Sequence, residues 1–284
     1  MSERVIPNGE TIPAPTTYTH GHDDSVLRSH RWRTAANSAA YLLPRLRPGL
    51  TLLDVGCGPG TLTADLAATV EPGDVLGIDL AAEVIEEATR LAGGPGPTNL
   101  RFAAGDLHTV GRPARGFDVV HAHQVLQHLA DPVRALQAMG ALLSPDGIVA
   151  CRDADYSAFT WWPHEPLLDR WLQIYRDVTQ HNGAECDAGR RLLHWARRAG
   201  FDDVSYTTSN WTFCTPHDLD WWCSLWADRV TTSRFGEQAV AYGLSERDEL
   251  AAIGAAWREW GTRPDAVFVV PHGEIIASGP RQLL

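Results

Sequence analysis

Short apolar runs alternate with segments of helical periodicity over residues 51–151. Strands are predicted at residues 51–55, 75–78, 100–103, 117–123 and 148–151. Helices are predicted between them, at residues 61–70, 81–91 and 132–143. Strands that alternate with helices of about 10–15 residues are typical of βαβ units. We therefore expect an α/β fold with helices on both faces of a mostly parallel sheet, whose ligand binds at the carboxyl ends of the strands.

Three segments interrupt this alternation, namely residues 1–50, 156–186 and 216–262. The first is expected to contain a helix from Trp32 to Leu43, and the other two are predicted to be helical. Eight of the eleven tryptophans lie in these two helical segments: Trp161, Trp162, Trp171, Trp221, Trp222, Trp226, Trp257 and Trp260. We expect residues 1–50 to close over the ligand site and the two helical segments to form a substrate cap. The core then comprises residues 51–155, 187–215 and 263–284.

The composition limits the chemistry that the chain can perform. Its 284 residues carry a net charge of −11, and all 24 basic residues are arginine. Without lysine, a Schiff base and a P-loop lysine are both excluded. The acidic balance argues against a nucleic-acid partner, because phosphate neutralisation needs basic side chains. The widely spaced cysteines and the absence of a signal peptide or a long apolar run predict a cytoplasmic protein without a disulfide framework or a membrane span.

A glycine-rich turn follows the first predicted strand. The string Asp54-Val55-Gly56-Cys57-Gly58-Pro59-Gly60 leads directly into the helix at residues 61–70. A dinucleotide fingerprint needs a third glycine where Thr61 stands, and a P-loop needs lysine. An acid two residues before three alternating glycines resembles motif I of the class I S-adenosylmethionine-dependent methyltransferases. In that family the loop wraps the methionine end of the cofactor.

This resemblance implies a Rossmann-like three-layer sandwich with a mostly parallel seven-stranded sheet, and S-adenosylmethionine as cofactor. Two later positions fit the same family. Asp79, followed by Leu80, ends the second strand, where a carboxylate accepts hydrogen bonds from the ribose hydroxyls. In Gly105-Asp106-Leu107 the resemblance assigns the adenine amine to Asp106 and a backbone N–H to Leu107. A plain helix-capping role for Asp106 remains open.

The fourth strand ends in His121-Ala122-His123-Gln124. With the residues around it, this string resembles the methyltransferase type 11 group, which includes ubiquinone/menaquinone-type C-methyltransferases. His123 and Gln124 fall where this fold places the transferred methyl group, so both are expected to contact the cofactor. His123 is also a candidate general base, although simple packing is an equal alternative. His121 and His123 share a strand face, but no acidic residue lies at ligand spacing, so we expect no metal.

The segments around the core contain the candidate specificity residues. Tyr18 and Arg33 are the best candidates to reach the cofactor carboxylate or the substrate, while a solvated arginine face is the alternative for this segment. The candidate substrate residues are His22, Asp155, Trp162 and Trp222. Tryptophans at helical spacing more often form a core than a pocket. A cap this rich in aromatic residues nevertheless suits an aromatic or extended apolar substrate.

The sequence thus predicts a methyltransferase acting on a small molecule of the secondary-metabolite kind, without a nucleic-acid or membrane partner. Two alternatives remain: an NAD-dependent oxidoreductase, and a catalytically inactive regulatory protein that binds S-adenosylmethionine. The sequence does not determine which atom accepts the methyl group, nor whether the protein forms a homodimer.

Overall fold

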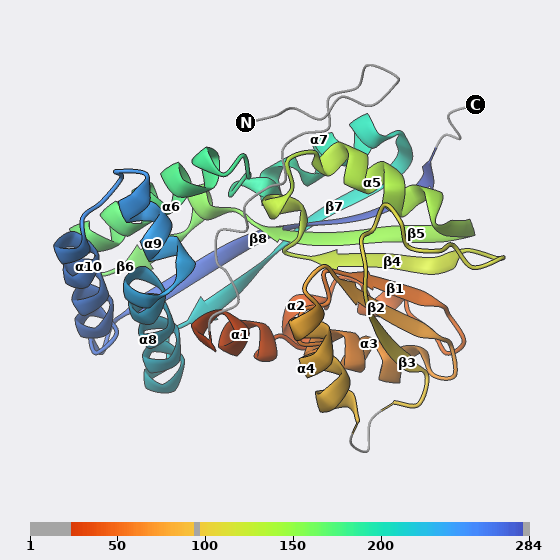
Figure 1. The fold of residues 1–284 in the computed structure, drawn as a ribbon, viewed down its shortest axis with the longest axis horizontal. Helices are drawn as coiled ribbons and strands as arrows, with labels where there is room; N and C mark the ends of the chain where they lie inside the picture. Colours follow the sequence, from red (N-terminus) through yellow and green to blue (C-terminus); the bar gives the residue numbers. More distant parts are fainter. Residues whose placement is uncertain (1–23, 94–96, 281–284) are drawn as a thin grey trace.

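The computed structural model describes residues 24–93 and 97–280. Within these ranges eight strands form one sheet (Figure 1). The strands are β1 (Leu52–Val55), β2 (Val75–Asp79), β3 (Leu100–Ala104), β4 (Phe117–His123), β5 (Leu143–Ala154), β6 (Thr160–Trp162), β7 (Phe201–Phe213) and β8 (Val267–Pro280). Their order is β3-β2-β1-β4-β5-β8-β6, and β7 pairs with β8 along its length. The five strands predicted by position are all present, and three further strands bring the sheet to one more than the seven implied by the resemblance.

The first five strands run parallel, and β8 is antiparallel to β5, β6 and β7. The helices are α1 (Asp24–Arg31), α2 (Ala35–Ser38), α3 (Thr61–Val70), α4 (Ala82–Ala92), α5 (Pro132–Ala141), α6 (Pro166–His181), α7 (Ala188–Ala199), α8 (Pro216–Thr232), α9 (Arg234–Ala241) and α10 (Arg247–Trp260). The mostly parallel sheet with crossover helices confirms the predicted Rossmann-like α/β class.

Helices cover both faces of the sheet, which gives three layers (Figure 1). On one face, Leu66 of α3 belongs to a buried cluster that includes Val119 of β4. On the other face, Leu136 of α5 belongs to a cluster that includes Val120 of the same strand, and α7 packs beside α5. Successive strand residues point to opposite faces, so β4 contributes to both clusters and lies at the centre of the sandwich.

The N-terminal segment differs from the prediction. The helix expected from Trp32 to Leu43 is absent; α1 ends at Arg31, and the four-residue α2 follows. The reason is a new helix start at Thr34, whose side chain accepts the N–H of Asn37 while the Asn37 side chain accepts the N–H of Thr34. This reciprocal cap begins α2 where the prediction had helix interior.

The helices of residues 156–186 and 216–262 gather at one end of the long strands β7 and β8 (Figure 1). They share an aromatic core around Trp171, which is fully buried. The ring centroid of Trp171 lies 4.5 Å from that of Trp226 on α8 and 4.9 Å from that of Trp257 on α10. We call this group of α6, α8, α9 and α10 the cap. Contrary to the all-helical prediction, the first segment also adds β6 to the edge of the sheet.

Candidate active site

A tight turn of three glycines connects β1 to α3. Gly56, Gly58 and Gly60 have φ values of 66°, 55° and 79°, a region in which side chains are strained. A Cβ atom on Gly60 would also collide with the ring of Phe102, and one on Gly56 with the side chain of Val125. Glycine at these positions lets the turn stay tight, so that its backbone and the N-terminus of α3 border the cavity described below.

Asp54, the acid before this turn, is buried and has two protein partners. Its Oδ1 lies 2.7 Å from Nδ1 of His121 on the neighbouring strand β4. Its Oδ2 accepts a hydrogen bond of 2.5 Å from the hydroxyl of Thr63 on α3. Asp54 therefore ties β1 to both β4 and α3, and its carboxylate stabilises the turn from within the protein.

Asp79 ends β2 beside the glycine turn. One of its oxygens accepts the N–H of Gly58 and the other accepts the N–H of Ala81, each at 3.1 Å. These bonds fix the carboxylate at the cavity wall, and each oxygen keeps a further lone pair for a ligand hydroxyl. The next residue, Leu80, is 75% exposed on the same wall and offers an apolar surface to a flat ligand ring.

Asp106 follows β3 at the same edge of the sheet. Its Oδ1 accepts the N–H of His108 at 2.8 Å, so Asp106 does cap the turn that follows. This bond engages one of its two carboxylate oxygens. The N–H of Gly105 donates to the backbone oxygen of Asp79 at 2.9 Å, which holds the loops after β2 and β3 together. Asp106 and Leu107 both border the cavity.

These loops line one side of a cavity of about 390 Å³, a volume typical of small-ligand sites. The cavity continues from the ends of β1, β2 and β3 to the cap. Its wall there includes the aromatic side chains of Tyr156, Phe159, Trp211, Trp222 and Trp226, of which the last two lie on α8 of the cap. His123 and Gln124, at the end of β4, also belong to the wall. A single cavity thus joins the predicted cofactor loops to an aromatic chamber.

His123 is buried, and neither of its ring nitrogens has a hydrogen-bond partner among the described residues. Burial lowers the pKa of His123 well below its ordinary value, and the positive charges of Arg33 and Arg152 lower it further. The imidazole is therefore neutral at neutral pH, with one nitrogen able to accept a proton or hydrogen bond and the other able to donate. Its ring centroid lies 5.7 Å from that of Trp211.

A chain of side chains crosses the cavity wall from the N-terminal segment to β8. Arg33 donates to Oε1 of Gln124 at 2.7 Å, and Nε2 of Gln124 lies 2.8 Å from Nε2 of His272. The other ring nitrogen of His272, Nδ1, lies 2.9 Å from the backbone oxygen of Val270 and must donate to it. In the neutral ring, Nε2 then accepts from the Gln124 amide. Gln124 also has a φ of 54°, unusual for a residue with a side chain.

Arg152 lies behind this chain on β5 and is almost fully buried. Its Nε donates to Glu274 and to the hydroxyl of Ser209, each at 3.1 Å. Burial lowers the pKa of Arg152 to about 10, against the opposing effect of Glu274, so the guanidinium remains charged. It lies 5.0 Å from the ring centre of Trp211, a cation–π distance.

The structure brings most of the predicted site residues to this cavity. Its lining includes Arg33, Asp54, Gly56, Cys57, Gly58, Asp79, Leu80, Gly105, Asp106, Leu107, His123, Gln124 and Trp222. Gly60 belongs to the turn but not to the lining. Tyr18 and His22 fall outside the described residues.

Two predicted substrate residues lie elsewhere. Trp162 is 64% exposed and outside the cavity lining, because it lies on the edge strand β6. Asp155 accepts two hydrogen bonds from Arg190, at 2.6 and 2.7 Å, and is also outside the lining. The prediction missed Trp211 and Arg229, which do line the cavity. Trp211 alternates along β7 with exposed residues, but only the pairing with β8 reveals which face it occupies.

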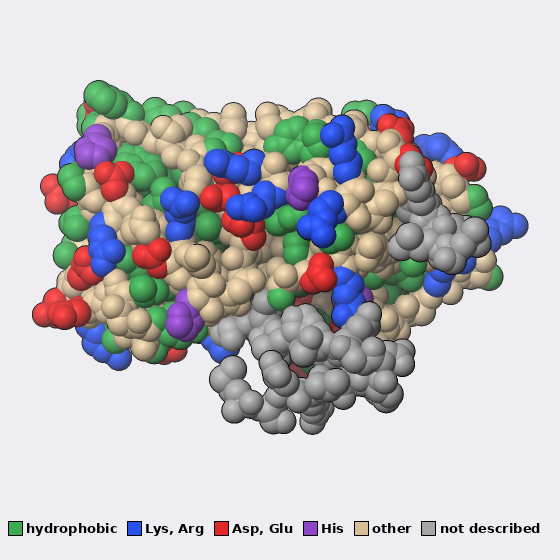
Figure 2. All heavy atoms as spheres, turned by 90° about the horizontal axis from the view of Figure 1, so that it is seen from above, with side chains coloured by type: hydrophobic (Ala, Val, Ile, Leu, Met, Phe, Trp, Pro, Cys, Tyr) green, Lys and Arg blue, Asp and Glu red, His purple; other side chains and the backbone are tan. Residues whose placement is uncertain are grey.

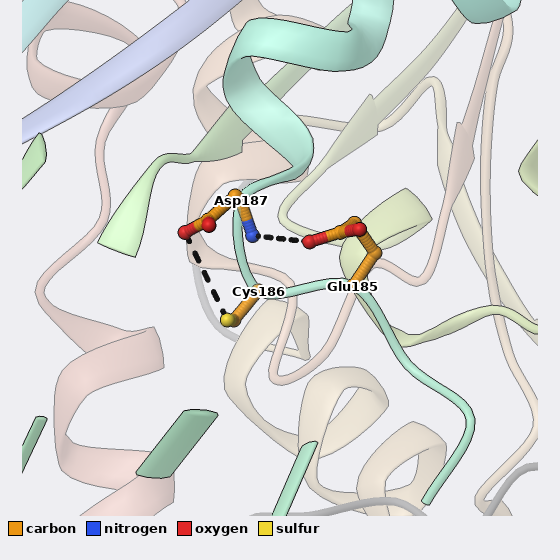
Figure 3. Close-up of side chains that lie close together, drawn as sticks. All are labelled: Glu185, Cys186 and Asp187. Atoms are coloured by element: carbon orange, nitrogen blue, oxygen red, sulfur yellow. Dashed lines mark hydrogen bonds between the residues drawn. The ribbon is translucent and has the colours of Figure 1, made fainter. Parts of the chain in front are cut away.

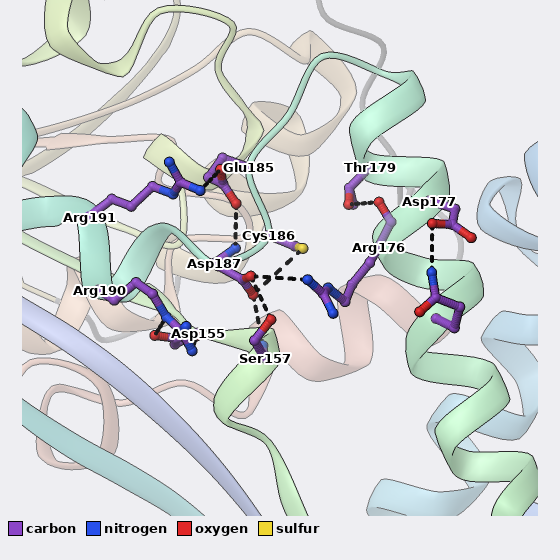
Figure 4. Close-up of polar contacts among 11 residues, drawn as sticks. Asp155, Ser157, Arg176, Asp177, Thr179, Glu185, Cys186, Asp187, Arg190 and Arg191 are labelled. Atoms are coloured by element: carbon purple, nitrogen blue, oxygen red, sulfur yellow. Dashed lines mark hydrogen bonds and ion pairs between the residues drawn. The ribbon is translucent and has the colours of Figure 1, made fainter.

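One cluster of potential metal ligands occurs in the described part of the chain: Glu185, Cys186 and Asp187, before α7 (Figure 3). Glu185 lies 2.9 Å from Arg191, and Asp187 lies 3.7 Å from Arg176 (Figure 4). Asp187 also accepts two hydrogen bonds from Ser157. The arginines already balance these carboxylates, so the geometry is that of an ion-pair network. Viewed from above Figure 1, arginine and acidic side chains are interspersed over the surface (Figure 2).

Comparison with known proteins identifies the family of the chain. Residues 46–200 match the family model described as a methyltransferase domain. The chain belongs to this family and is a class I S-adenosylmethionine-dependent methyltransferase.

Its relatives agree with this class. The chain is 29% identical to an uncharacterized methyltransferase of Schizosaccharomyces pombe, over 91% of this chain and 95% of that protein. It is 27% identical to a probable methyltransferase of Aspergillus luteorubrus, over 92% and 96% of the two chains. Among solved structures, phosphoethanolamine N-methyltransferase 2 of Haemonchus contortus, in complex with S-adenosyl-L-methionine, has a similar fold. Its TM-score is 0.58 at 14% identity, over 96% of this chain and 62% of that one.

S-adenosylmethionine is thus the cofactor, as predicted. Among the residues that the structure describes, no helix is both long and apolar enough to cross a bilayer.

Proposed function

We propose that the protein transfers a methyl group from S-adenosylmethionine to a small aromatic or apolar molecule bound at the cap. One observation carries this proposal: the loops after β1, β2 and β3 and the aromatic wall of the cap border the same cavity. The interior of such a cavity is too narrow for a folded macromolecule, and its aromatic walls match a flat or apolar ligand.

The residues at the strand ends fit the cofactor. In our assignment the turn from Gly56 to Gly60 surrounds its methionine part, and Asp79 accepts from the ribose hydroxyls. Leu80 packs on the adenine, and Asp106 and Leu107 bind the polar edge of that base. Asp54 supports cofactor binding indirectly, by holding the turn in place, because its carboxylate oxygens already contact His121 and Thr63.

Arg33, which is hydrogen-bonded to Gln124, lies beside the end of the glycine turn. The hydroxyl of Thr61, at the start of α3, donates to the backbone oxygen of Arg33 at 3.1 Å. This bond anchors the N-terminal segment beside the turn. We assign to Arg33 the carboxylate of the cofactor, with Gln124 holding its guanidinium in place.

The bound sulfonium supplies an activated methyl group together with its own leaving group. The protein contributes alignment, exclusion of water and, for a weak nucleophile, removal of a proton. His123 is neutral, buried and on the cavity wall, so it is the candidate to accept that proton. Residues 156–186 and 216–262 then act as the substrate cap.

Two measurements test the proposal. Calorimetry with S-adenosylmethionine, S-adenosylhomocysteine and NAD should show binding of the first two only. A screen of aromatic small molecules, with S-adenosylhomocysteine release as readout, should find acceptors. Binding of NAD alone would contradict the proposal in favour of an oxidoreductase. Binding of S-adenosylmethionine without turnover of any small molecule would favour a regulatory role.

A further inference from the structure

Several polar atoms of the residues that line the cavity have no partner within the described part of the chain. Both nitrogens of His123, Oε1 of Gln127 and Nε1 of Trp222 are buried in this way. A buried polar group without a hydrogen bond destabilises the protein. These atoms therefore favour a ligand that carries both a hydrogen-bond donor and an acceptor, and a purely hydrocarbon ligand would leave them unsatisfied.

The charges around the cap end of the cavity are positive. Arg229 borders the cavity, is almost fully buried, and lies 5.1 Å from the ring centre of Trp226. Arg33, assigned above to the cofactor carboxylate, borders the cavity as well, and Arg152 lies against Trp211, where its Nε pairs with Glu274. The carboxylates on the described cavity wall are Asp54, Asp79 and Asp106. Asp54 lies in β1, Asp79 ends β2 and Asp106 follows β3, at the other end of the cavity.

This distribution selects against cations. An ammonium group taken from water into an apolar chamber needs an opposite charge. No carboxylate is among the described residues that line the cap end, and Glu274, which lies behind them, already pairs with Arg152. Burial lowers the pKa of His123, and the positive charges of Arg33 and Arg152, which disfavour its protonated form, lower it further. They stabilise negative charge in the same way, including the charge that develops on an ionising hydroxyl.

Resting on the proposed function, we propose that the methyl acceptor is an aromatic compound with an acidic hydroxyl group, a phenol or an enol. Its ring packs among Trp211, Trp222 and Trp226, and its hydroxyl meets His123. Amines that are protonated at neutral pH are rejected. The fold alone does not imply this, since a structure of similar fold is named as a phosphoethanolamine N-methyltransferase.

The reaction is then the formation of an aryl or enol methyl ether. The hydroxyl donates a hydrogen bond to the accepting nitrogen of His123, which takes the proton only as the oxygen forms its bond to the methyl carbon and the positive charge of the sulfonium is lost. The bond from that carbon to the sulfonium sulfur breaks, and its electron pair stays on sulfur, which gives S-adenosylhomocysteine. His123 later returns the proton to water, so atoms and charge balance.

Binding of matched ligands tests this without requiring turnover. The full-length protein, saturated with S-adenosylhomocysteine, is titrated by calorimetry with 2-naphthol and with 2-naphthylmethylamine, which is an ammonium ion at neutral pH. The expected result is binding of 2-naphthol at least about tenfold more tightly, since a difference of about 1.4 kcal/mol corresponds to this factor. Equal binding, tighter binding of the amine, or no binding of 2-naphthol overturns the proposal.

Two pairs of variants test which residues recognise 2-naphthol. Trp222→Phe removes an indole N–H on the cavity wall, and Trp257→Phe removes one that is buried in the cap but outside the cavity lining. The first should weaken 2-naphthol binding about threefold or more, and the second should not. His123→Leu should reduce the preference for 2-naphthol over the amine, while His123→Gln should retain part of it. An unchanged preference in His123→Leu contradicts the assignment.

The proposed function and this inference can be refuted by different outcomes. If the protein does not bind S-adenosylhomocysteine, the cofactor assignment is wrong whatever the naphthalene ligands do. If 2-naphthol binds with the expected preference but no hydroxyl compound is methylated, the binding preference stands and the transfer reaction is refuted.

Discussion

Gln124 and His272 lie 148 positions apart in the chain, yet their side chains meet at 2.8 Å. His272 must accept in this contact because its other nitrogen faces the backbone oxygen of Val270. The Gln124 amide is therefore held with its oxygen toward Arg33. The orientation of Arg33 at the cavity wall thus depends on a residue of the last strand.

Gln124→Glu tests this dependence. The new carboxylate still accepts from Arg33 but has no N–H for His272, so it favours a protonated His272 instead. In the wild type, burial and the charge of Arg152 lower the pKa of His272. We expect the variant to raise that pKa, so that its affinity for S-adenosylmethionine decreases at least about threefold between about pH 6 and about pH 8. Calorimetry at both pH values measures the ratio of the two dissociation constants. A ratio equal to that of the wild type would contradict the dependence of Arg33 on His272 through Gln124.

Asp79→Asn should weaken cofactor binding. A hydrogen bond to a charged group contributes about 1.5–3 kcal/mol, which corresponds to about 10–100-fold in the dissociation constant. The matched control is Asp74→Asn, just before the same strand, where the side chain is 68% exposed. Titration with S-adenosylhomocysteine should separate the two variants. Equal affinities would exclude Asp79 from the site.

Gly60→Ala should destabilise the protein by about 2–4 kcal/mol, because strain at positive φ adds to a collision with Phe102. Gly49→Ala is the control. Gly49 has a φ of 90°, but no atom lies within 4 Å of the position that a Cβ would take, so only the strain remains, about 1 kcal/mol. Urea denaturation gives both free energies of unfolding. A similar loss in the two variants would show that the close approach of Phe102 is unimportant.

Asp153, on β5, provides a pH test. Burial raises its pKa to about 7 from an ordinary value of 3.8. Unfolding between these values releases a proton, so the contribution of Asp153 to stability decreases as pH rises from about 4 to about 7, by up to about 4 kcal/mol. Asp153→Asn removes this contribution.

The difference in unfolding free energy between Asp153→Asn and the wild type should therefore favour the variant more at about pH 8 than at about pH 5. Denaturation at both pH values measures it. Asp146→Asn, at an exposed position of the same strand, is the control. A pH-independent difference for Asp153→Asn would mean that this side chain is ionised in the folded protein throughout.

The local parts of the site could be predicted from the sequence. Asp54, the three glycines and Asp79 are close along the chain or at strand ends, where the parallel sheet brings them together. Hydrophobic spacing likewise identified α3, which spans residues 61–70 as predicted. These features depend on one strand or one turn at a time.

Features that depend on distant pairing could not be predicted. The partner of Gln124 follows from the antiparallel register of β8, in which His272 lies opposite Ala154. Apolar character did not distinguish Trp162, exposed at the sheet edge, from Trp222, buried at the cavity. Nor did alternation reveal that Arg190 pairs with Asp155, since that contact needs the position of α7.

The strand β8 has a consequence for protein engineering. It pairs with β5 in the core over Val149 to Ala154 and with β6 beside the cap, so one continuous backbone belongs to both parts. The cap is therefore not a cassette that can be exchanged between relatives at two loop junctions. A chimera with a new acceptor preference would have to import the C-terminal strand as well, and with it the histidine that orients Arg33.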